Sequence, residues 1–129
     1  MKELKYKYTI WSKATKTLVV IICTSIIVWF LIFYCFFDIA HIVGQDIISV
    51  LDSPDGNYEI VVYRNNGGAT VNYTLLCAIR STTTGKEKNI YWEYPYQEPV
   101  IQWDSKYVVI INGHKLNIKK DTYDYRRKR

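Results

Sequence analysis

The chain has 129 residues and a formal net charge of +5, and 49% of its residues are hydrophobic. This length accommodates one domain beside a membrane-spanning segment, which argues against a multidomain protein. The positive charge is concentrated at the two ends, residues 1–16 and 126–129, whereas the part between is mildly acidic. This distribution argues against a nucleic-acid partner, which would favour a continuous basic surface.

An apolar run at residues 17–37 follows the basic arm. It reads TLVVIICTSIIVWFLIFYCFF, 21 residues without a charge. As an α-helix rising about 1.5 Å per residue, it would cover roughly 30 Å, the hydrocarbon thickness of a bilayer. The run is too long for a signal peptide, and residues 36–40 contain no small-x-small cleavage site. Bulky residues precede Cys23 and Cys35, which argues against lipoprotein processing. We therefore predict an uncleaved, single-pass signal-anchor helix.

The charges that flank this run predict its orientation. Five lysines and one glutamate precede it, whereas four aspartates follow it before the first basic residue, Arg64. The positive-inside rule then places residues 1–16 in the cytoplasm and the C-terminal part outside. Tyr8 and Trp11 fit an aromatic belt at the inner interface. The predicted location is therefore the cell membrane, with an extracytoplasmic C-terminal domain.

Residues 38–46 are expected to form a juxtamembrane helix or linker, and residues 47–125 a β domain. Short runs with strand propensity alternate there with turn signals such as Pro54-Asp55-Gly56 and Asn112-Gly113. The expected strands occupy residues 47–51, 58–64, 71–80, 89–94, 100–104, 106–112 and 114–118. Both faces of the 71–80 run are apolar, which predicts an interior strand. The fold class is therefore mainly β: one N-terminal transmembrane helix, then a small antiparallel meander forming a barrel or sandwich.

Several motifs in this domain occur in a recognisable order: SPDGNY from Ser53, NGGAT from Asn66, IYWEY from Ile90, VIINGHKLNI from Val109 and DTYDYRR from Asp121. Across residues 47–127 this order resembles the bacterial, mainly Gram-positive, proteins grouped as domain of unknown function 5412. The resemblance implies a short outer domain behind an N-terminal membrane anchor. It implies no activity, substrate or catalytic residue.

Residues that carry enzyme chemistry are scarce. The two histidines, His41 and His114, have no partners at the spacing of a zinc site, and we predict neither a metal nor another cofactor. Cys77 lies in an apolar strand, where a thiolate is disfavoured. We therefore do not expect an enzyme. The alternative is a small hydrolase or transferase of envelope glycans that uses Glu93 and Glu98.

Aromatic residues and these two carboxylates gather between positions 91 and 103. They are a candidate binding surface for sugar rings or for the apolar surface of a partner, although aromatic residues also pack in sheet cores. Strict alternation places Ile90, Trp92 and Tyr94 on one face of the strand. The candidate residues are Tyr91, Trp92, Glu93, Tyr94, Tyr96, Glu98 and Trp103.

The basic tail, residues 126–129, is either a solvated terminus or a site that attracts an anionic wall polymer or lipid headgroups. The leading hypothesis is a non-enzymatic binding or interaction module, with the lipid bilayer and a membrane protein, envelope protein or glycan as partners. A further alternative is an accessory subunit whose single helix packs in a larger membrane complex.

Overall fold

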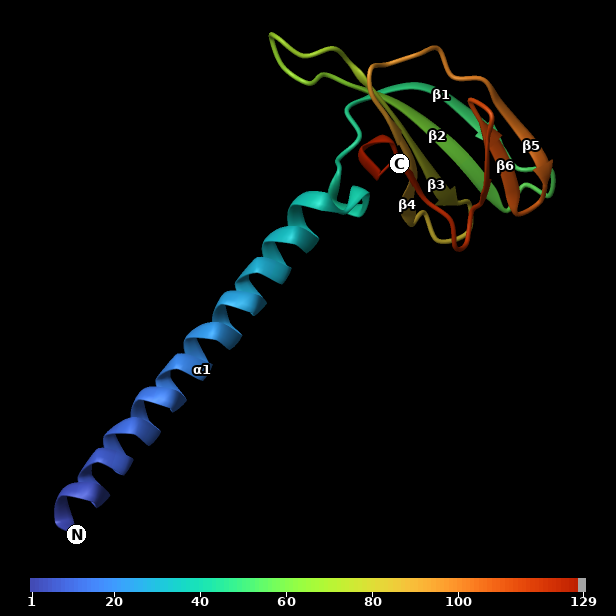
Figure 1. Cartoon of the computed structure of the whole chain (residues 1–129). Helices are drawn as coiled ribbons and strands as arrows, with labels where there is room; N and C mark the ends of the chain where they lie inside the picture. Colours follow the sequence, from blue (N-terminus) through green and yellow to red (C-terminus); the bar gives the residue numbers. More distant parts are fainter. Residues whose placement is uncertain (128–129) are drawn as a thin grey trace. The chain divides into compact units, whose positions relative to one another are not determined.

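A computed structural model describes residues 1–127, except for the side chains of Tyr8, Ile10 and Trp11. The predictions for Tyr8, Trp11 and the last two residues of the basic tail therefore lie outside the described residues. The chain forms two compact units, Met1–Asp38 and Ile39–Arg129. Figure 1 shows the first as a helix and the second as a β-rich domain.

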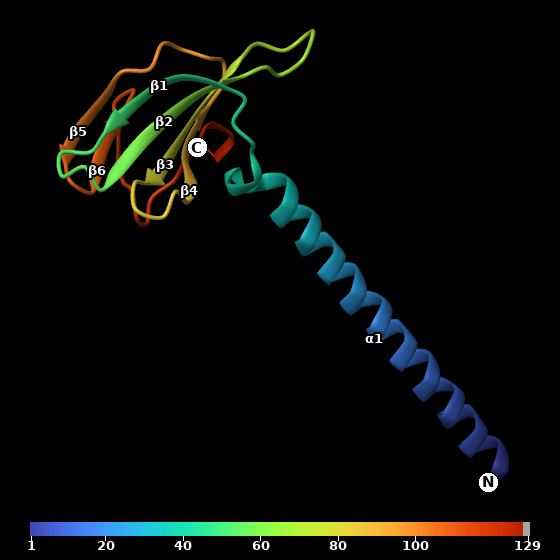
Figure 2. The ribbon, with the colours of Figure 1, turned by 180° about the vertical axis from the view of Figure 1, so that it is seen from behind.

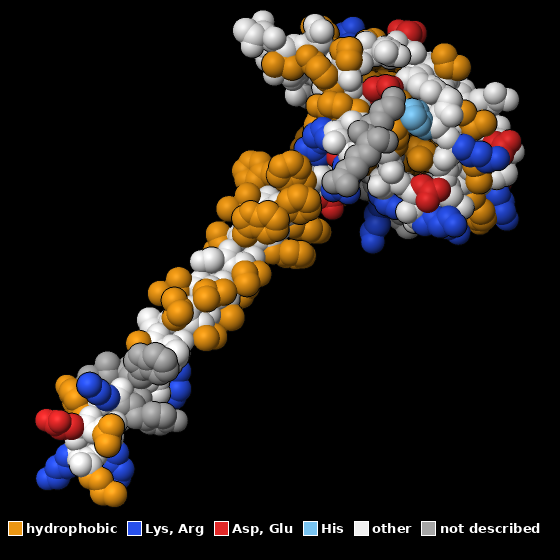
Figure 3. All heavy atoms as spheres, in the orientation of Figure 1, with side chains coloured by type: hydrophobic (Ala, Val, Ile, Leu, Met, Phe, Trp, Pro, Cys, Tyr) orange, Lys and Arg blue, Asp and Glu red, His pale blue; other side chains and the backbone are white. Residues whose placement is uncertain are grey.

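The first unit is one α-helix, α1, which spans Lys2–Phe37 and so includes the basic arm. It is long and apolar enough to cross a membrane, and no residue between 17 and 37 is buried. Figure 3 shows hydrophobic side chains covering it beyond its charged N-terminal end. The hydroxyls of Thr24 and Ser25 donate to the carbonyls of Val20 (2.9 Å) and Ile21 (2.8 Å). These polar groups are therefore satisfied within the helix, as an apolar environment requires.

The second unit contains two sheets, seen from opposite sides in Figures 1 and 2. The larger sheet has the order β1-β2-β3-β4-β8, and the smaller one β5-β6-β7. The strands are β1 (Asp46–Asp52), β2 (Tyr58–Asn65), β3 (Thr74–Ser81), β4 (Glu87–Glu93), β5 (Ile101–Ser105), β6 (Val108–Ile111), β7 (His114–Asn117) and β8 (Tyr123–Asp124). Two 3-10 turns, η1 (Ile39–His41) and η2 (Tyr125–Arg127), lie at the ends of the unit.

The predicted mainly β fold is confirmed, although the sheets do not close into a barrel. Their facing sides share one core, to which the larger sheet contributes Ile60 and Leu75 and the smaller one Val109 and Ile111. All seven expected strands are present. The eighth, β8, was not expected, and it pairs parallel to β4, so the meander is not purely antiparallel.

The interior strand is β3. Leu75 and Cys77 face the shared core, while Leu76 and Ala78 belong to a second cluster on the other face of the sheet. All four side chains are buried. The prediction that both faces of this strand are covered is therefore confirmed, and it follows from the absence of a polar alternation in the sequence.

The segment after α1 covers part of that second face. The side-chain amide of Asn89 in β4 donates to the carbonyls of Ile39 and Ile42, both at 2.7 Å. Asn65 at the end of β2 donates to the Val43 carbonyl at 2.9 Å. A Cβ at Gly44 would overlap the ring of Tyr63, so the chain can approach this closely only with glycine. Residues 39–45 are thus docked on the sheet.

The two turn motifs have the backbone conformations that their residues favour. Gly56 has φ +71°, and the Ser53 hydroxyl donates to the Asp55 carboxylate at 2.7 Å. Asn112 and Gly113, with φ +47° and +83°, form the tight hairpin between β6 and β7. The turn predictions at both places are confirmed, because local backbone preference decides them.

Candidate functional site

The seven residues of the predicted aromatic surface do not form one surface. Tyr91 is fully buried, and Tyr96 and Trp103 pack against the core between the sheets. Trp92 packs on the opposite face of the larger sheet. Glu93 and Tyr94 are half-buried, whereas Glu98 is exposed and accepts a hydrogen bond from the Tyr96 hydroxyl at 3.1 Å. The sheet therefore divides the set into inward and outward members.

A bulge in β4 causes this division. Cys77 of β3 pairs with Tyr91, but Ala78 pairs with Asn89, so Ile90 is an extra residue in the ladder. Ile90 and Tyr91 consequently both face the core, and Trp92 faces the other side. The expectation from strict alternation, that Ile90 and Trp92 share a face, was wrong. An extra residue in a strand shifts the inward–outward alternation by one position, so the residues beyond the bulge point to the opposite face from the one expected.

The inward members form a hydrogen-bonded network around Glu93. Its carboxylate accepts a short hydrogen bond from the Tyr91 hydroxyl and another from the Asn112 side-chain amide at 3.0 Å. Burial, and next the hydrogen bond to Glu93, raises the pKa of Tyr91. The ring of Tyr91 stacks on Tyr123 of β8 with centroids 4.8 Å apart. The network holds together β4, β8 and the β6–β7 hairpin.

The outward members meet the C-terminal end of the chain. The guanidinium of Arg126 lies 4.5 Å above the centre of the Trp92 ring, and Tyr125 packs edge-on against that ring at 5.1 Å. Tyr125 also contacts Tyr94, with centroids 5.7 Å apart. Trp92, Tyr94, Tyr125 and the arginine therefore form one aromatic and basic group, which we call the C-terminal cluster.

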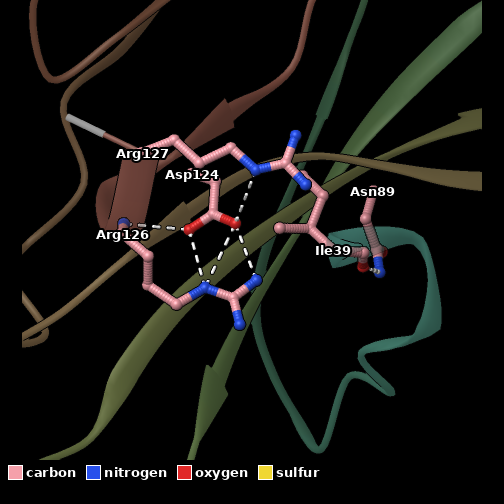
Figure 4. Close-up of polar contacts among 5 residues, drawn as sticks. All are labelled: Ile39, Asn89, Asp124, Arg126 and Arg127. Carbon is pink, nitrogen blue, oxygen red and sulfur yellow. Dashed lines mark hydrogen bonds and ion pairs between the residues drawn. The ribbon is translucent and has the colours of Figure 1, made fainter. Parts of the chain in front are cut away.

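Asp124 fixes the position of this cluster. Its side chain is only 5% exposed and binds the Arg126 guanidinium at 2.7 Å, with Arg127 3.8 Å away (Figure 4). Burial alone would raise the pKa of Asp124, but the hydrogen bonds and charges of Arg126 and Arg127 outweigh it and lower the pKa. The expectation of a solvated terminus therefore does not hold for Arg126, which is packed on both a carboxylate and an indole ring.

A third feature is the free edge of the larger sheet. β1 is the terminal strand of that sheet among the described strands. Its apolar side chains Ile47, Ile48 and Val50 are 55%, 37% and 47% exposed. An exposed strand edge with apolar side chains is a template for pairing with another strand. The described residues contain no group of three or more metal-ligating side chains.

Comparison with models of protein families gives a match over most of the chain. The model of the family of unknown function DUF5412 matches residues 12–128. The chain belongs to the DUF5412 family. The resemblance inferred from the motifs is thereby confirmed, and the match extends N-terminally into α1. No curated protein and no solved structure matches the chain.

For this DUF5412 member, sequence reasoning missed two of the three features. Asp124 and Arg126 lie in the DTYDYRR motif, but nothing in a linear pattern shows that this carboxylate is buried. The exposure of β1 was also missed, because DIISVLD is as apolar as an interior strand. Only the strand order shows that β1 has one neighbour.

Proposed function

We propose that this DUF5412 member is a single-pass membrane protein whose extracytoplasmic β domain is a non-enzymatic interaction module. In this proposal β1 accepts an extended segment of a partner protein of the cell envelope as an additional strand. The observation that carries it is the free β1 edge with its exposed apolar side chains Ile47, Ile48 and Val50. Strand addition at a sheet edge is a common mode of peptide recognition.

The charges on β1 favour a different chain over a second copy of this one. Asp46 and Asp52 stand at the two ends of the strand. Two antiparallel copies of β1 paired about Ser49 would place Asp46 of one opposite Asp52 of the other, and like charges opposite each other are destabilising. A partner strand with apolar residues in the middle and lysine or arginine at both ends would be complementary.

The membrane anchor in the proposal rests on α1 and its flanks. The helix carries an uncharged run long enough for a bilayer, and its apolar side chains are exposed. Five lysines precede this run, which favours a cytoplasmic N-terminus. Membrane burial would remove this apolar surface from water.

The surroundings of Glu93 and Cys77 support the non-enzymatic character of the domain. The Glu93 carboxylate is engaged by Tyr91 and Asn112. Cys77 is fully buried, and burial raises the pKa of its thiol to about 12, which keeps the thiol protonated. Glu93 therefore has hydrogen-bond partners within the fold, and Cys77 lies in apolar surroundings that suit a neutral thiol.

Orientation is tested by labelling with a membrane-impermeant maleimide in intact cells. We expect Thr83→Cys, in the exposed β3–β4 turn, to be labelled, and Lys5→Cys to be labelled only after lysis. The reverse pattern would place the β domain in the cytoplasm. Labelling of both in intact cells would contradict a membrane-spanning α1.

Strand addition is tested with a synthetic peptide, Lys-Val-Thr-Val-Thr-Val-Lys, added to the full chain in lipid nanodiscs. We expect slower amide hydrogen exchange in β1 and no such slowing with the matched Glu-Val-Thr-Val-Thr-Val-Glu peptide. Ile48→Lys with Val50→Lys should abolish the effect, whereas Thr83→Lys should not. Equal slowing by both peptides, or none, would contradict the proposal. A native partner crosslinked through α1 and not through β1 would favour the accessory-subunit alternative.

A further inference from the structure

The fold returns the C-terminal basic tail to the start of the β domain. The Ile39 carbonyl accepts a hydrogen bond from Asn89 of β4 at 2.7 Å. Asp124 of β8 pairs with Trp92, which is also in β4. Asn89 and Trp92 are three residues apart on β4, which is about 10 Å along a strand. Figure 4 shows Ile39 with Asn89, and Asp124 with Arg126 and Arg127, in one close-up. Ile39 and Arg126 thus both contact β4, at positions three residues apart, although 87 positions separate them in the sequence.

Covalent connection keeps Ile39 close to the end of the apolar helix. Ile39 follows Phe37, the last residue of α1, by two positions. Two residues span at most about 7 Å. Where α1 spans a bilayer, as the proposed function holds, the attachment point on β4 is therefore within reach of the membrane surface.

The net positive charge of the β domain comes from this tail. Residues 39–125 contain eight Lys and Arg residues against ten Asp and Glu residues, whereas residues 126–129 are all basic. The Arg127 side chain is 61% exposed, and Arg126 is held between Asp124 and the Trp92 ring. One buried carboxylate thus positions the first residues of a run that carries four positive charges.

The aromatic residues of the C-terminal cluster suit the headgroup region of a membrane. Trp92, Tyr94 and Tyr125 are each half-buried beside Arg126. Tryptophan and tyrosine are enriched at the level of lipid headgroups, and arginine binds phosphate. The Arg126 guanidinium is already paired with Asp124, so the 61% exposed Arg127 is the described arginine that would meet phosphate. The combination is therefore complementary to the phosphate layer of a membrane.

We propose that the C-terminal cluster and tail bind the phosphate of anionic lipid headgroups and so hold the β domain against the bilayer that contains α1. The proposal rests on the membrane anchor but holds for either side of the membrane. Each basic residue near an anionic surface strengthens binding roughly fivefold. Because the attraction is electrostatic, it weakens as the salt concentration rises.

The test uses the full chain in nanodiscs of phosphatidylcholine with and without phosphatidylglycerol. A photoreactive benzoylphenylalanine replaces Tyr125, and mass spectrometry identifies the lipid that it captures. We expect phosphatidylglycerol adducts about fivefold or more above the share of that lipid in the bilayer. The same probe at Thr83, in the exposed β3–β4 turn outside the C-terminal cluster, should capture phosphatidylglycerol only in proportion to its share of the bilayer.

Two matched triple variants show where the charge acts. Arg127→Gln, Lys128→Gln and Arg129→Gln together should reduce phosphatidylglycerol capture to its share of the bilayer. Lys86→Gln, Lys106→Gln and Lys120→Gln, which remove the same charge from other exposed positions, should preserve the enrichment. Equal loss in both variants, or lipid capture at position 125 without enrichment, would overturn the proposal. So would loss of lipid capture when inorganic phosphate is present during irradiation, at an ionic strength at which sodium chloride leaves the capture unchanged, because this would identify a soluble phosphate ligand.

A probe at Leu31 in α1 separates failure of this proposal from failure of the anchor. Lipid capture at Leu31 with none at position 125 would reject headgroup binding and keep the membrane anchor. No capture at Leu31 would reject the anchor itself.

Discussion

The side-chain amide of Asn89 donates to the backbone carbonyl of Ile39 across 50 residues of sequence, at 2.7 Å. The same amide also donates to Ile42. One side chain in the middle of the β domain therefore anchors the segment that connects this domain to the apolar helix.

Replacing Asn89 should detach this connector. We expect Asn89→Ala to lower the free energy of unfolding of the β domain by about 1–3 kcal/mol, because two carbonyls lose their donor. Denaturant titration of the full chain in detergent measures the change, and amide exchange at residues 39–43 should accelerate. Asn72→Ala, at an exposed loop position, is the matched control and should have little effect. An unchanged stability for both variants would show that the connector is not held by Asn89.

Gly44 is expected to tolerate no side chain. A Cβ at this position would overlap the ring of Tyr63, so Gly44→Ala should cost about 1–3 kcal/mol through displacement of the ring or the backbone. The double variant Gly44→Ala with Tyr63→Val should lose less than the sum of the two single variants, because the smaller side chain leaves room for the Cβ. Additive losses in the thermodynamic cycle would contradict a direct clash.

Asp124 should make the domain sensitive to acid. Although burial opposes it, the hydrogen bonds and charges of Arg126 and Arg127 lower its pKa in the folded state below the ordinary value of 3.8. Its contribution to stability is therefore present above about pH 4 and is lost as the pH falls through the lower folded value. Asp124→Asn should cost about 1.5–3 kcal/mol at neutral pH and flatten the stability profile below pH 4. Asp104→Asn, which breaks an exposed ion pair with Lys115, should change stability by less than about 1 kcal/mol. An acid profile that is the same for both variants would exclude Asp124 as the cause.

Alkaline conditions should also destabilise the domain. The pKa of Cys77 is raised from 9.0 to about 12 by burial, and burial with Glu93 raises that of Tyr91 above 10. Both groups ionise first in the unfolded chain, so stability is full below pH 9 and falls above it, by about 1.4 kcal/mol per pH unit for each group. Denaturant titrations between pH 8 and 11 measure the slope. Cys77→Ala should reduce it between pH 9 and 10, and a flat profile for the unaltered chain would contradict the prediction.

Local sequence signals were sufficient for the apolar helix, for seven of the eight described strands and for two turns of this protein. The uncharged run at residues 17–37, the turns at Gly56 and Asn112-Gly113, and the two apolar faces of β3 follow from composition and backbone preference alone. Such signals act over a few residues and need no partner. The motif order was also sufficient to identify the DUF5412 family.

Tertiary structure decided which side chains meet. The bulge at Ile90, which turns Tyr91 inward and leaves Trp92 outward, arises from pairing with β3 and has no mark in the sequence of β4. β8 is only two residues long and depends on β4 for its existence as a strand. Its pairing buries Asp124 and brings Arg126 to the Trp92 ring. Sequence alone therefore determined an apolar helix followed by a β domain, whereas the two faces of β4 and the place of the basic tail depended on contacts between distant strands.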